Sequence, residues 1–276
     1  MIQDIGEHTF DNQYHPCPPD RESYALYYED HAALVRKYPD RIEFPKFRDI
    51  ERLNEDIYED AVYLFSIDGE RYYLVEEINR ERQSHFTMEN TEIFRYAEPQ
   101  YLAFAGITGY QLHNWYQSRR FCGKCGRRMK KDSKERMLYC ESCHNMEFPK
   151  ICPAVIIGVT DGDKILMSKY AGRTYKKYAL LAGFTEIGET LEETVQREVM
   201  EEVGLKVKNI RYYKSQPWSF TDTLLMGFYC DLDGGAAITL DREELAMAEW
   251  FQRDEIPVEP ERDSITNEMI IRFKNW

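Results

Sequence analysis

The sequence lacks the features that mark membrane-spanning and secreted proteins. No apolar run among its 276 residues approaches the roughly 18 that a membrane-spanning helix needs. The first ten residues, MIQDIGEHTF, have neither a basic start nor an apolar stretch, so no secretory signal is expected. Internal repeats and low-complexity segments are also missing. We therefore predict a soluble, cytoplasmic protein with no membrane partner.

What the sequence does contain is enough apolar material for about two folded domains. Its hydrophobic fraction is 43% and its aromatic fraction is 14%, which excludes global disorder. Strand-like runs flank the turn residues Asp68-Gly69 and 161–163, and helices are expected over 109–120 and 189–203. This mixture of strands and helices predicts an α+β or α/β fold.

Four of the seven cysteines form two close pairs with the spacing C-x2-C-x14-C-x2-C. Two such pairs on separate turns bring four thiolates to one tetrahedral Zn²⁺ and leave no open position for chemistry. A redox-active pair is the weaker alternative, because two matched pairs suit a closed metal site better. We predict one structural zinc per chain, with Cys122, Cys125, Cys140 and Cys143 as ligands. Cys17, Cys152 and Cys230 have no matched partner and are expected to be packed or free thiols.

Acidic residues outnumber basic ones over the chain as a whole, but not around these cysteines. The formal net charge is −13, which disfavours binding to nucleic acid. Residues 119–150, however, hold ten Lys/Arg and four Asp/Glu, a net charge of +6. These cations either contact phosphates or offset a negative zinc–tetrathiolate centre and stay solvated. The second interpretation is favoured, because the rest of the chain repels a polyanion.

The segment Gly183–Leu205, GFTEIGETLEETVQREVMEEVGL, contains seven glutamates and one arginine. In a helix over 189–203 that ends at Gly204, three of the glutamates, Glu198, Glu201 and Glu202, fall on one face. Arg197 lies one turn from both Glu193 and Glu201, where it can hold carboxylates. Clustered carboxylates need cations, and oxygen ligands without His or Cys favour Mg²⁺ or Mn²⁺.

This segment resembles the Nudix box, G-x5-E-x7-R-E-U-x-E-E-x-G-U, in which U is aliphatic. All fixed positions match: Gly183, Glu189, Arg197, Glu198, Val199, Glu201, Glu202, Gly204 and Leu205. The resemblance to Nudix hydrolases implies an α/β/α sandwich that cleaves a nucleoside diphosphate linked to another group. It also implies catalytic roles for Glu189, Arg197, Glu198, Glu201 and Glu202. The implied metal ligands are the glutamates at 198, 201 and 202, the backbone carbonyl of Ala182, and Glu244.

Nine residues after the box, SQPWSFTDT (215–223) resembles SQPWPFPxS, the signature of the NADH pyrophosphatase branch. That branch also has a four-cysteine ribbon before its Nudix domain. The resemblance implies an N-terminal domain over 1–116, a zinc ribbon over 117–148 and a Nudix domain over 149–276. Ser219, Thr221 and Thr223 differ from the Pro, Pro and Ser of the signature.

The same resemblance implies a substrate pocket and a homodimer that contributes to it. Pocket positions fall on Phe184, Gln216, Pro217, Trp218, Ser219, Phe220, Thr221, Asp222 and Thr223. Contacts across the dimer fall on Glu135, Phe148 and Arg95, and Thr266 stands where the family often has Ala. Trp218 and Phe220 are expected to offer a stacking platform for a ring.

The implied reaction is hydrolysis of the pyrophosphate of NAD(H) to nicotinamide mononucleotide and AMP, and removal of NAD caps from RNA 5′ ends. One alternative is a Nudix hydrolase of ADP-ribose, diadenosine polyphosphates or another nucleoside diphosphate derivative. From a different class comes a Nudix-fold regulator that binds nucleotides and DNA without hydrolysis. The intact box and the acidic composition speak against this regulator.

Overall fold

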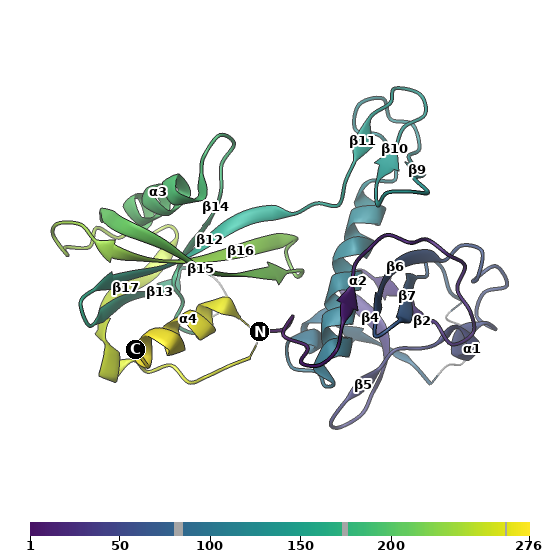
Figure 1. Ribbon diagram of the computed structural model, residues 1–276, viewed down its shortest axis with the longest axis horizontal. Coiled ribbons are helices and arrows are strands. Elements are labelled where there is room, and N and C mark those ends of the chain that lie inside the picture. Colours follow the sequence, from purple (N-terminus) through teal and green to yellow (C-terminus); the bar gives the residue numbers. More distant parts are fainter. Residues whose placement is uncertain (80–84, 173–175, 263) are drawn as a thin grey trace. The chain divides into compact units, whose positions relative to one another are not determined.

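The computed structural model describes residues 1–79, 85–172, 176–262 and 264–276, and it divides into two compact units. The N-terminal unit comprises Ile2–Lys150 together with Ser219–Thr221. The C-terminal unit comprises Met1, Ile151–Trp218 and Asp222–Trp276. Figure 1 labels their elements along the chain. Within the described ranges, no helix has the length and apolar character to cross a membrane.

The C-terminal unit is built on a six-stranded mixed sheet in the order β15-β16-β12-β13-β17, with β14 also paired to β12. β12 and β16 run parallel, and the other pairs are antiparallel. The strands are β12 (Cys152–Asp161), β13 (Lys164–Tyr170), β14 (Leu181–Phe184), β15 (Val207–Trp218), β16 (Thr223–Leu232) and β17 (Leu245–Gln252).

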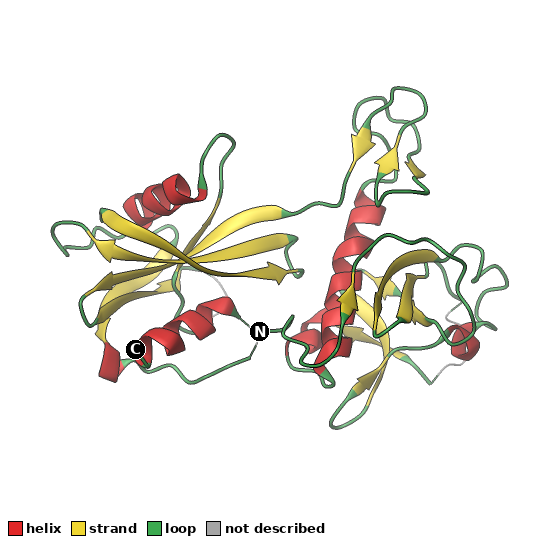
Figure 2. Ribbon diagram, in the orientation of Figure 1, coloured by secondary structure: helices red, strands yellow, loops and turns green. Residues whose placement is uncertain are grey.

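Two helices, α3 (Leu191–Val203) and α4 (Ile265–Lys274), cover opposite faces of this sheet (Figure 2). Alternation along β12 explains the layers, because successive strand residues point to opposite faces. Val155 and Ile157 pack in one core with Val195 and Val199 of α3. The intervening Ile156 packs in a second core with residues of α4. The predicted α/β/α sandwich is confirmed. A short helix η2 (Arg253–Glu255) follows β17.

Before the four-cysteine segment, the N-terminal unit contains two small sheets, with strand orders β1-β6-β7-β2 and β3-β4-β5, and β8 also pairs with β4. Its single long helix runs beside them. The elements are β1 (Phe10–Asp11), β2 (Tyr24–Leu26), β3 (Tyr28–Glu29), β4 (Ala32–Lys37), β5 (Ile42–Glu43), α1 (Phe47–Ile50), β6 (Val62–Ile67), β7 (Glu70–Leu74), β8 (Thr87–Asn90), η1 (Thr91–Arg95) and α2 (Gln100–Ser118). β6 and β7 form the hairpin predicted around Asp68-Gly69, and both turn residues have positive φ.

Helix α2 is longer than the sequence predicted. The expected helix over 109–120 is the second half of an element that begins at Gln100. Most of its side chains are buried, including Phe104 and Ile107, so its first half has no polar face. After α2 the chain enters a three-stranded sheet that carries the four cysteines, formed by β9 (Lys130–Lys131), β10 (Leu138–Tyr139) and β11 (Met146–Glu147).

Candidate active site and metal centre

Local sequence signals define both ends of α3. Thr190 is the N-cap, its hydroxyl accepts from the backbone N–H of Glu193, and the Glu193 carboxylate accepts from the N–H of Thr190 in return. At the other end Gly204 adopts the left-handed conformation, with φ +68°, as the predicted C-cap. The helix therefore starts at Leu191, two residues later than expected, and Glu189 lies in the preceding loop.

Arg197 is the centre of the carboxylate cluster. It binds Glu189 through two hydrogen bonds, with Nε–Oε1 and Nη2–Oε2 distances of 2.5 and 3.0 Å. Its Nη1 also donates to Glu198 at 2.7 Å and to Glu201 at 2.9 Å, and Nη2 donates to the carbonyl of Phe184 at 2.9 Å. The bonds from Arg197 to Glu189 are the largest cause that lowers the pKa of Glu189 to about 2.

One expectation from the sequence is corrected by this arrangement. Arg197 does lie one turn from Glu193 in α3, but it does not hold that carboxylate, because the Glu193 carboxylate accepts hydrogen bonds from the N–H and the hydroxyl of Thr190. The loop residue Glu189 takes that place. Sequence reasoning also missed Thr194, whose buried hydroxyl donates to Glu189 at 3.0 Å. A small hydroxyl residue facing the turn before the helix was the only signal for it.

The other side of the cluster is buried against β14. Glu198 and Glu202 have relative exposures of only 8% and 2%. Burial raises the pKa of Glu198, and the nearby charges of Glu201 and Glu244 act in the same direction. Gly183 in β14 permits this approach, because a Cβ there would collide with the Glu198 carboxyl group. The effect of Glu244 on the pKa of Glu198 shows that the two carboxyl groups lie close together, although they are 46 positions apart in the sequence.

The donor set fits a hard divalent cation. Glu198 and Glu202 are buried and Glu201 and Glu244 are exposed, and carboxylate oxygens together with a backbone carbonyl, such as that of Ala182 in β14, are the ligands that Mg²⁺ and Mn²⁺ prefer. Among the described residues, no three carboxylates have oxygen atoms that all lie within 4.8 Å of one another. Over the described ranges, the four cysteines are the only group of three or more His/Cys/Asp/Glu residues whose ligand atoms all lie within 4.8 Å of one another.

The expected pocket residues lie at the end of β15 and in the turn after it. Gln216 is fully buried, and its side-chain oxygen accepts from the backbone N–H of Ile265 at 2.7 Å. This bond connects β15 to the first turn of α4, where the half-buried Thr266 lies. Trp218 pairs with Thr223 across the hairpin, Pro217 is exposed, and Asp222 has φ +57°. Phe184 follows the box glycine and is 55% exposed.

The turn residues Ser219, Phe220 and Thr221 group with the N-terminal unit. There the guanidinium of Arg95 lies over the ring of Phe220, 4.5 Å from its centroid. A cation on an aromatic face is a favourable contact. The structure thus brings together two predicted site residues that are far apart in the sequence. Glu135 and Phe148 are both exposed, as residues that contact a second protein must be before it binds.

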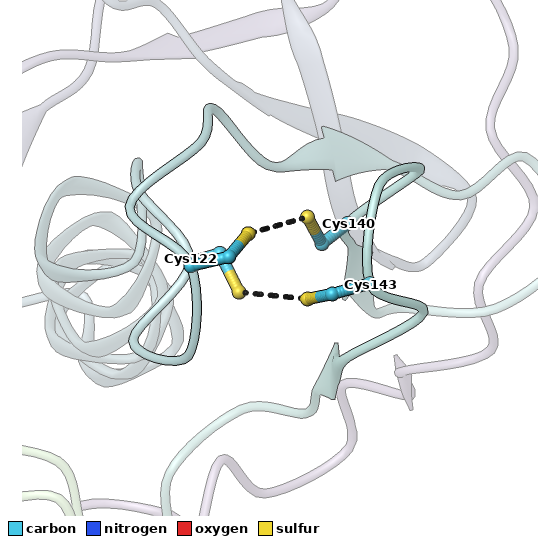
Figure 3. Close-up of side chains that lie close together, drawn as sticks. Cys122, Cys140 and Cys143 are labelled. Atoms are coloured by element: carbon cyan, nitrogen blue, oxygen red, sulfur yellow. Dashed lines mark hydrogen bonds between the residues drawn. The ribbon is translucent and has the colours of Figure 1, made fainter.

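The four cysteines form a compact centre in which two similar turns face each other (Figure 3). The Sγ atoms of Cys122 and Cys143 are 3.5 Å apart, and those of Cys125 and Cys140 are 3.4 Å apart. In each turn the residue after the second cysteine has positive φ, +73° for Gly126 and +57° for a histidine in the other turn. Hydrogen bonds from the backbone N–H groups of Cys143 and Ser142 lower the pKa of Cys140, which favours the thiolate that zinc binds.

The fold and these two centres together define a Nudix domain that is preceded by a zinc ribbon. Residues 150–273 match the family model of the NUDIX domain, and residues 117–148 match that of the NADH pyrophosphatase zinc ribbon domain. The chain therefore carries a Nudix domain and the zinc ribbon of NADH pyrophosphatases, and the predicted structural zinc site is confirmed.

Curated relatives match more than half of the chain. The chain is 41% identical over 162 residues to a protein of Photorhabdus laumondii named "NAD-capped RNA hydrolase NudC", a match that covers 59% of this chain and 63% of that protein. A protein of the same name from Enterobacter sp. is also 41% identical, with 62% of its length covered. Among solved structures, a NUDIX hydrolase from Nitrosomonas europaea is 24% identical with a TM-score of 0.49, covering 56% of this chain and 90% of that one.

Proposed function

We propose that this protein hydrolyses the pyrophosphate of NAD(H) to nicotinamide mononucleotide and AMP. The same reaction on NAD-capped RNA releases nicotinamide mononucleotide and leaves a 5′-monophosphate on the RNA. The observation that carries the proposal is the intact carboxylate cluster, in which Arg197 holds Glu189, Glu198 and Glu201 beside the buried Glu202. The NADH pyrophosphatase ribbon and the names of the relatives support the choice of a dinucleotide substrate.

The residues that would hold Mg²⁺ or Mn²⁺ are Glu198, Glu201, Glu202, Glu244 and the carbonyl of Ala182. Such ions neutralise charge on the two phosphates and lower the pKa of an attacking water. Arg197 fixes the orientation of the carboxylate cluster, because all three of its guanidinium nitrogens donate hydrogen bonds to carboxylates of that cluster. One of the carboxylates, at 201 or 202, accepts the proton of the attacking water.

Substrate recognition is assigned to residues near the ends of β14 and β15 and to a second copy of the chain. Trp218 and Phe184 offer ring faces near the ends of β15 and β14, and Gln216 fixes the first turn of α4 beside Thr266. The exposed Glu135 and Phe148 reach the site of a second copy in a homodimer. We place the protein in the cytoplasm, because a reducing compartment keeps cysteines such as the exposed Cys125 as thiols that are ready for zinc.

The test is turnover by a Glu202→Gln variant. This change keeps the shape of a buried side chain but removes its charge, so kcat for NADH should fall by several orders of magnitude at saturating Mg²⁺. Unfolding by urea and zinc content should match the parent protein. Near-normal kcat in the folded variant would contradict the assignment of this site. ADP-ribose is the competing substrate, and mass analysis of the products distinguishes the two reactions.

A further inference from the structure

A small cavity lies where the zinc ribbon joins α2, and its lining is strongly cationic. Its volume is about 80 Å³, and it is lined by four cations and one carboxylate, together with apolar and neutral residues. The charged lining residues are Arg119, Arg120, Arg128, Lys131 and Glu76. In a protein with a net charge of −13, such a concentration of positive charge is an exception that calls for a ligand.

The one carboxylate does not neutralise these cations. Glu76 is shared by Lys131, at 2.7 Å, and Arg120, at 3.8 Å. Arg119 has only a distant partner, Glu147 at 3.7 Å. Within the described part of the chain, Arg128 has no carboxylate within 4.0 Å. The side chains of Arg119, Arg120 and Lys131 are all between 41% and 47% exposed, so they remain accessible to a ligand.

The backbone holds the cations in place. The N–H of Met129 donates to the carbonyl of Arg120 at 2.9 Å, and Phe121 and Arg128 form an antiparallel bridge. Lys131 belongs to β9 and pairs with Leu138 of β10. The residues that follow α2 and those that lead into β9 are thus connected by hydrogen bonds, and the four cations come to one cleft without the entropy cost of ordering a mobile loop.

The zinc centre does not use these side chains. Backbone N–H groups donate to the sulfurs of Cys122 and Cys140, and no Lys or Arg side chain of the described ribbon is hydrogen-bonded to any of its four sulfurs. The sequence alone favours cations that merely offset the tetrathiolate charge. The geometry reverses that preference, since the charged ends of these residues line a cavity of their own.

We propose that this ribbon cleft binds a backbone phosphate of the RNA that carries the NAD cap. The inference rests on the proposed function for the identity of the RNA. The cleft selects a phosphodiester because guanidinium groups pair with phosphate oxygens in planar fashion. Tyr116, the aromatic residue in the lining, is buried and faces Lys131 at 5.6 Å, so no base stacks there. Binding is therefore independent of RNA sequence.

The experiment compares two substrates in the full-length protein. Arg120→Gln/Arg128→Gln should lower kcat/KM for NAD-capped RNA about tenfold and leave kcat/KM for NADH within about twofold. The slope of log kcat/KM against log salt for capped RNA should weaken by about 0.7 for each phosphate that the variant no longer binds. Arg21→Gln/Lys37→Gln, which removes the same charge from exposed, carboxylate-paired positions of the same unit, is the matched control and should change neither substrate.

Glu76→Gln gives a test in the opposite direction, because removal of the only carboxylate in the cleft should raise kcat/KM for capped RNA and leave NADH unchanged. A defect in ribbon folding cannot produce that gain. An equal fall for both substrates in the arginine variant would overturn the proposal in favour of a structural role. Anisotropy of an uncapped RNA, which should bind more weakly to the arginine variant, keeps the test valid even if the parent protein hydrolyses no NADH. Equal binding to both proteins would overturn the proposal independently.

Discussion

Arg197→Lys is the most informative change in the active site. The arginine makes five hydrogen bonds to three carboxylates and one carbonyl, and a lysine ammonium cannot reproduce this planar fork. Its partner Glu198 has a side chain only 11% exposed, so the variant leaves a nearly buried carboxylate poorly paired. Breaking a buried ion pair costs about 3–5 kcal/mol.

The expected loss is smaller than that full range. The Arg197 side chain is itself 26% exposed, and the lysine keeps its charge and one contact, so we expect a loss of about 2 kcal/mol. Misplaced carboxylates should lower kcat about 100-fold, since displacement of a catalytic group by about 1 Å has an effect of that size. Urea unfolding gives the first quantity, and steady-state NADH hydrolysis at saturating Mg²⁺ gives the second.

Arg211→Lys supplies the matched control. Arg211 also binds one carboxylate through two bonds, to Asp231 at 2.8 and 3.1 Å, but its side chain is 47% exposed and lies outside the cluster. We expect a loss below about 1 kcal/mol and unchanged turnover for this variant. If Arg197→Lys resembles Arg211→Lys in both measurements, the organising role assigned to Arg197 is wrong.

Three further outcomes follow from the same structure. Gly183→Ala should lower kcat at least about 100-fold by displacing the Glu198 carboxyl group, whereas Gly235→Ala, which has open space around it, should be neutral in the same assay. Glu189→Gln should lower the free energy of unfolding at about pH 7, because the lowered pKa of Glu189 stabilises the fold while its carboxylate is ionised. The difference from the parent should vanish as the pH falls from the ordinary pKa of 4.5 toward 2, where the carboxylate becomes protonated. Equal differences in urea unfolding at about pH 7 and about pH 2 would refute this. Cys140→Ser should lose the bound zinc. In the parent, a chelator that removes Mg²⁺ should stop turnover, and metal analysis should still find one zinc per chain. Full activity after that treatment would contradict separate roles for a structural zinc and a catalytic Mg²⁺.

Local patterns predicted the helix α3 well. Val195, Val199 and Val203 recur at helical spacing and are fully buried, and Gly204 ends the helix as expected. The first residue of α3 is harder to predict, because the capping pair Thr190 and Glu193 begins the helix two residues after the expected start at Glu189. This difference leaves Glu189 in the loop, from which its carboxylate reaches Arg197.

Other features had no local signal. The first half of α2 is apolar on all sides, so periodicity does not reveal a helix there, and only tertiary packing around Phe104 and Ile107 defines it. The contact of Arg95 with Phe220 joins segments that are far apart in the sequence. The negative charge of Glu244 raises the pKa of Glu198 only because the fold brings these two residues close together. The composition of the ribbon showed its charge, but only the structure shows that four cations line one cavity.

The most direct test of the proposed activity is kcat/KM for NADH, NAD⁺ and ADP-ribose at equal Mg²⁺, measured for the parent and for Trp218→Ala. We predict that NADH or NAD⁺ is preferred over ADP-ribose. Loss of the ring in Trp218→Ala should slow the dinucleotides more than ADP-ribose, because a stacked base contributes about 1–3 kcal/mol. Preference for ADP-ribose, or an equal effect of Trp218→Ala on all three substrates, would contradict the assignment and identify a general nucleoside diphosphate hydrolase instead.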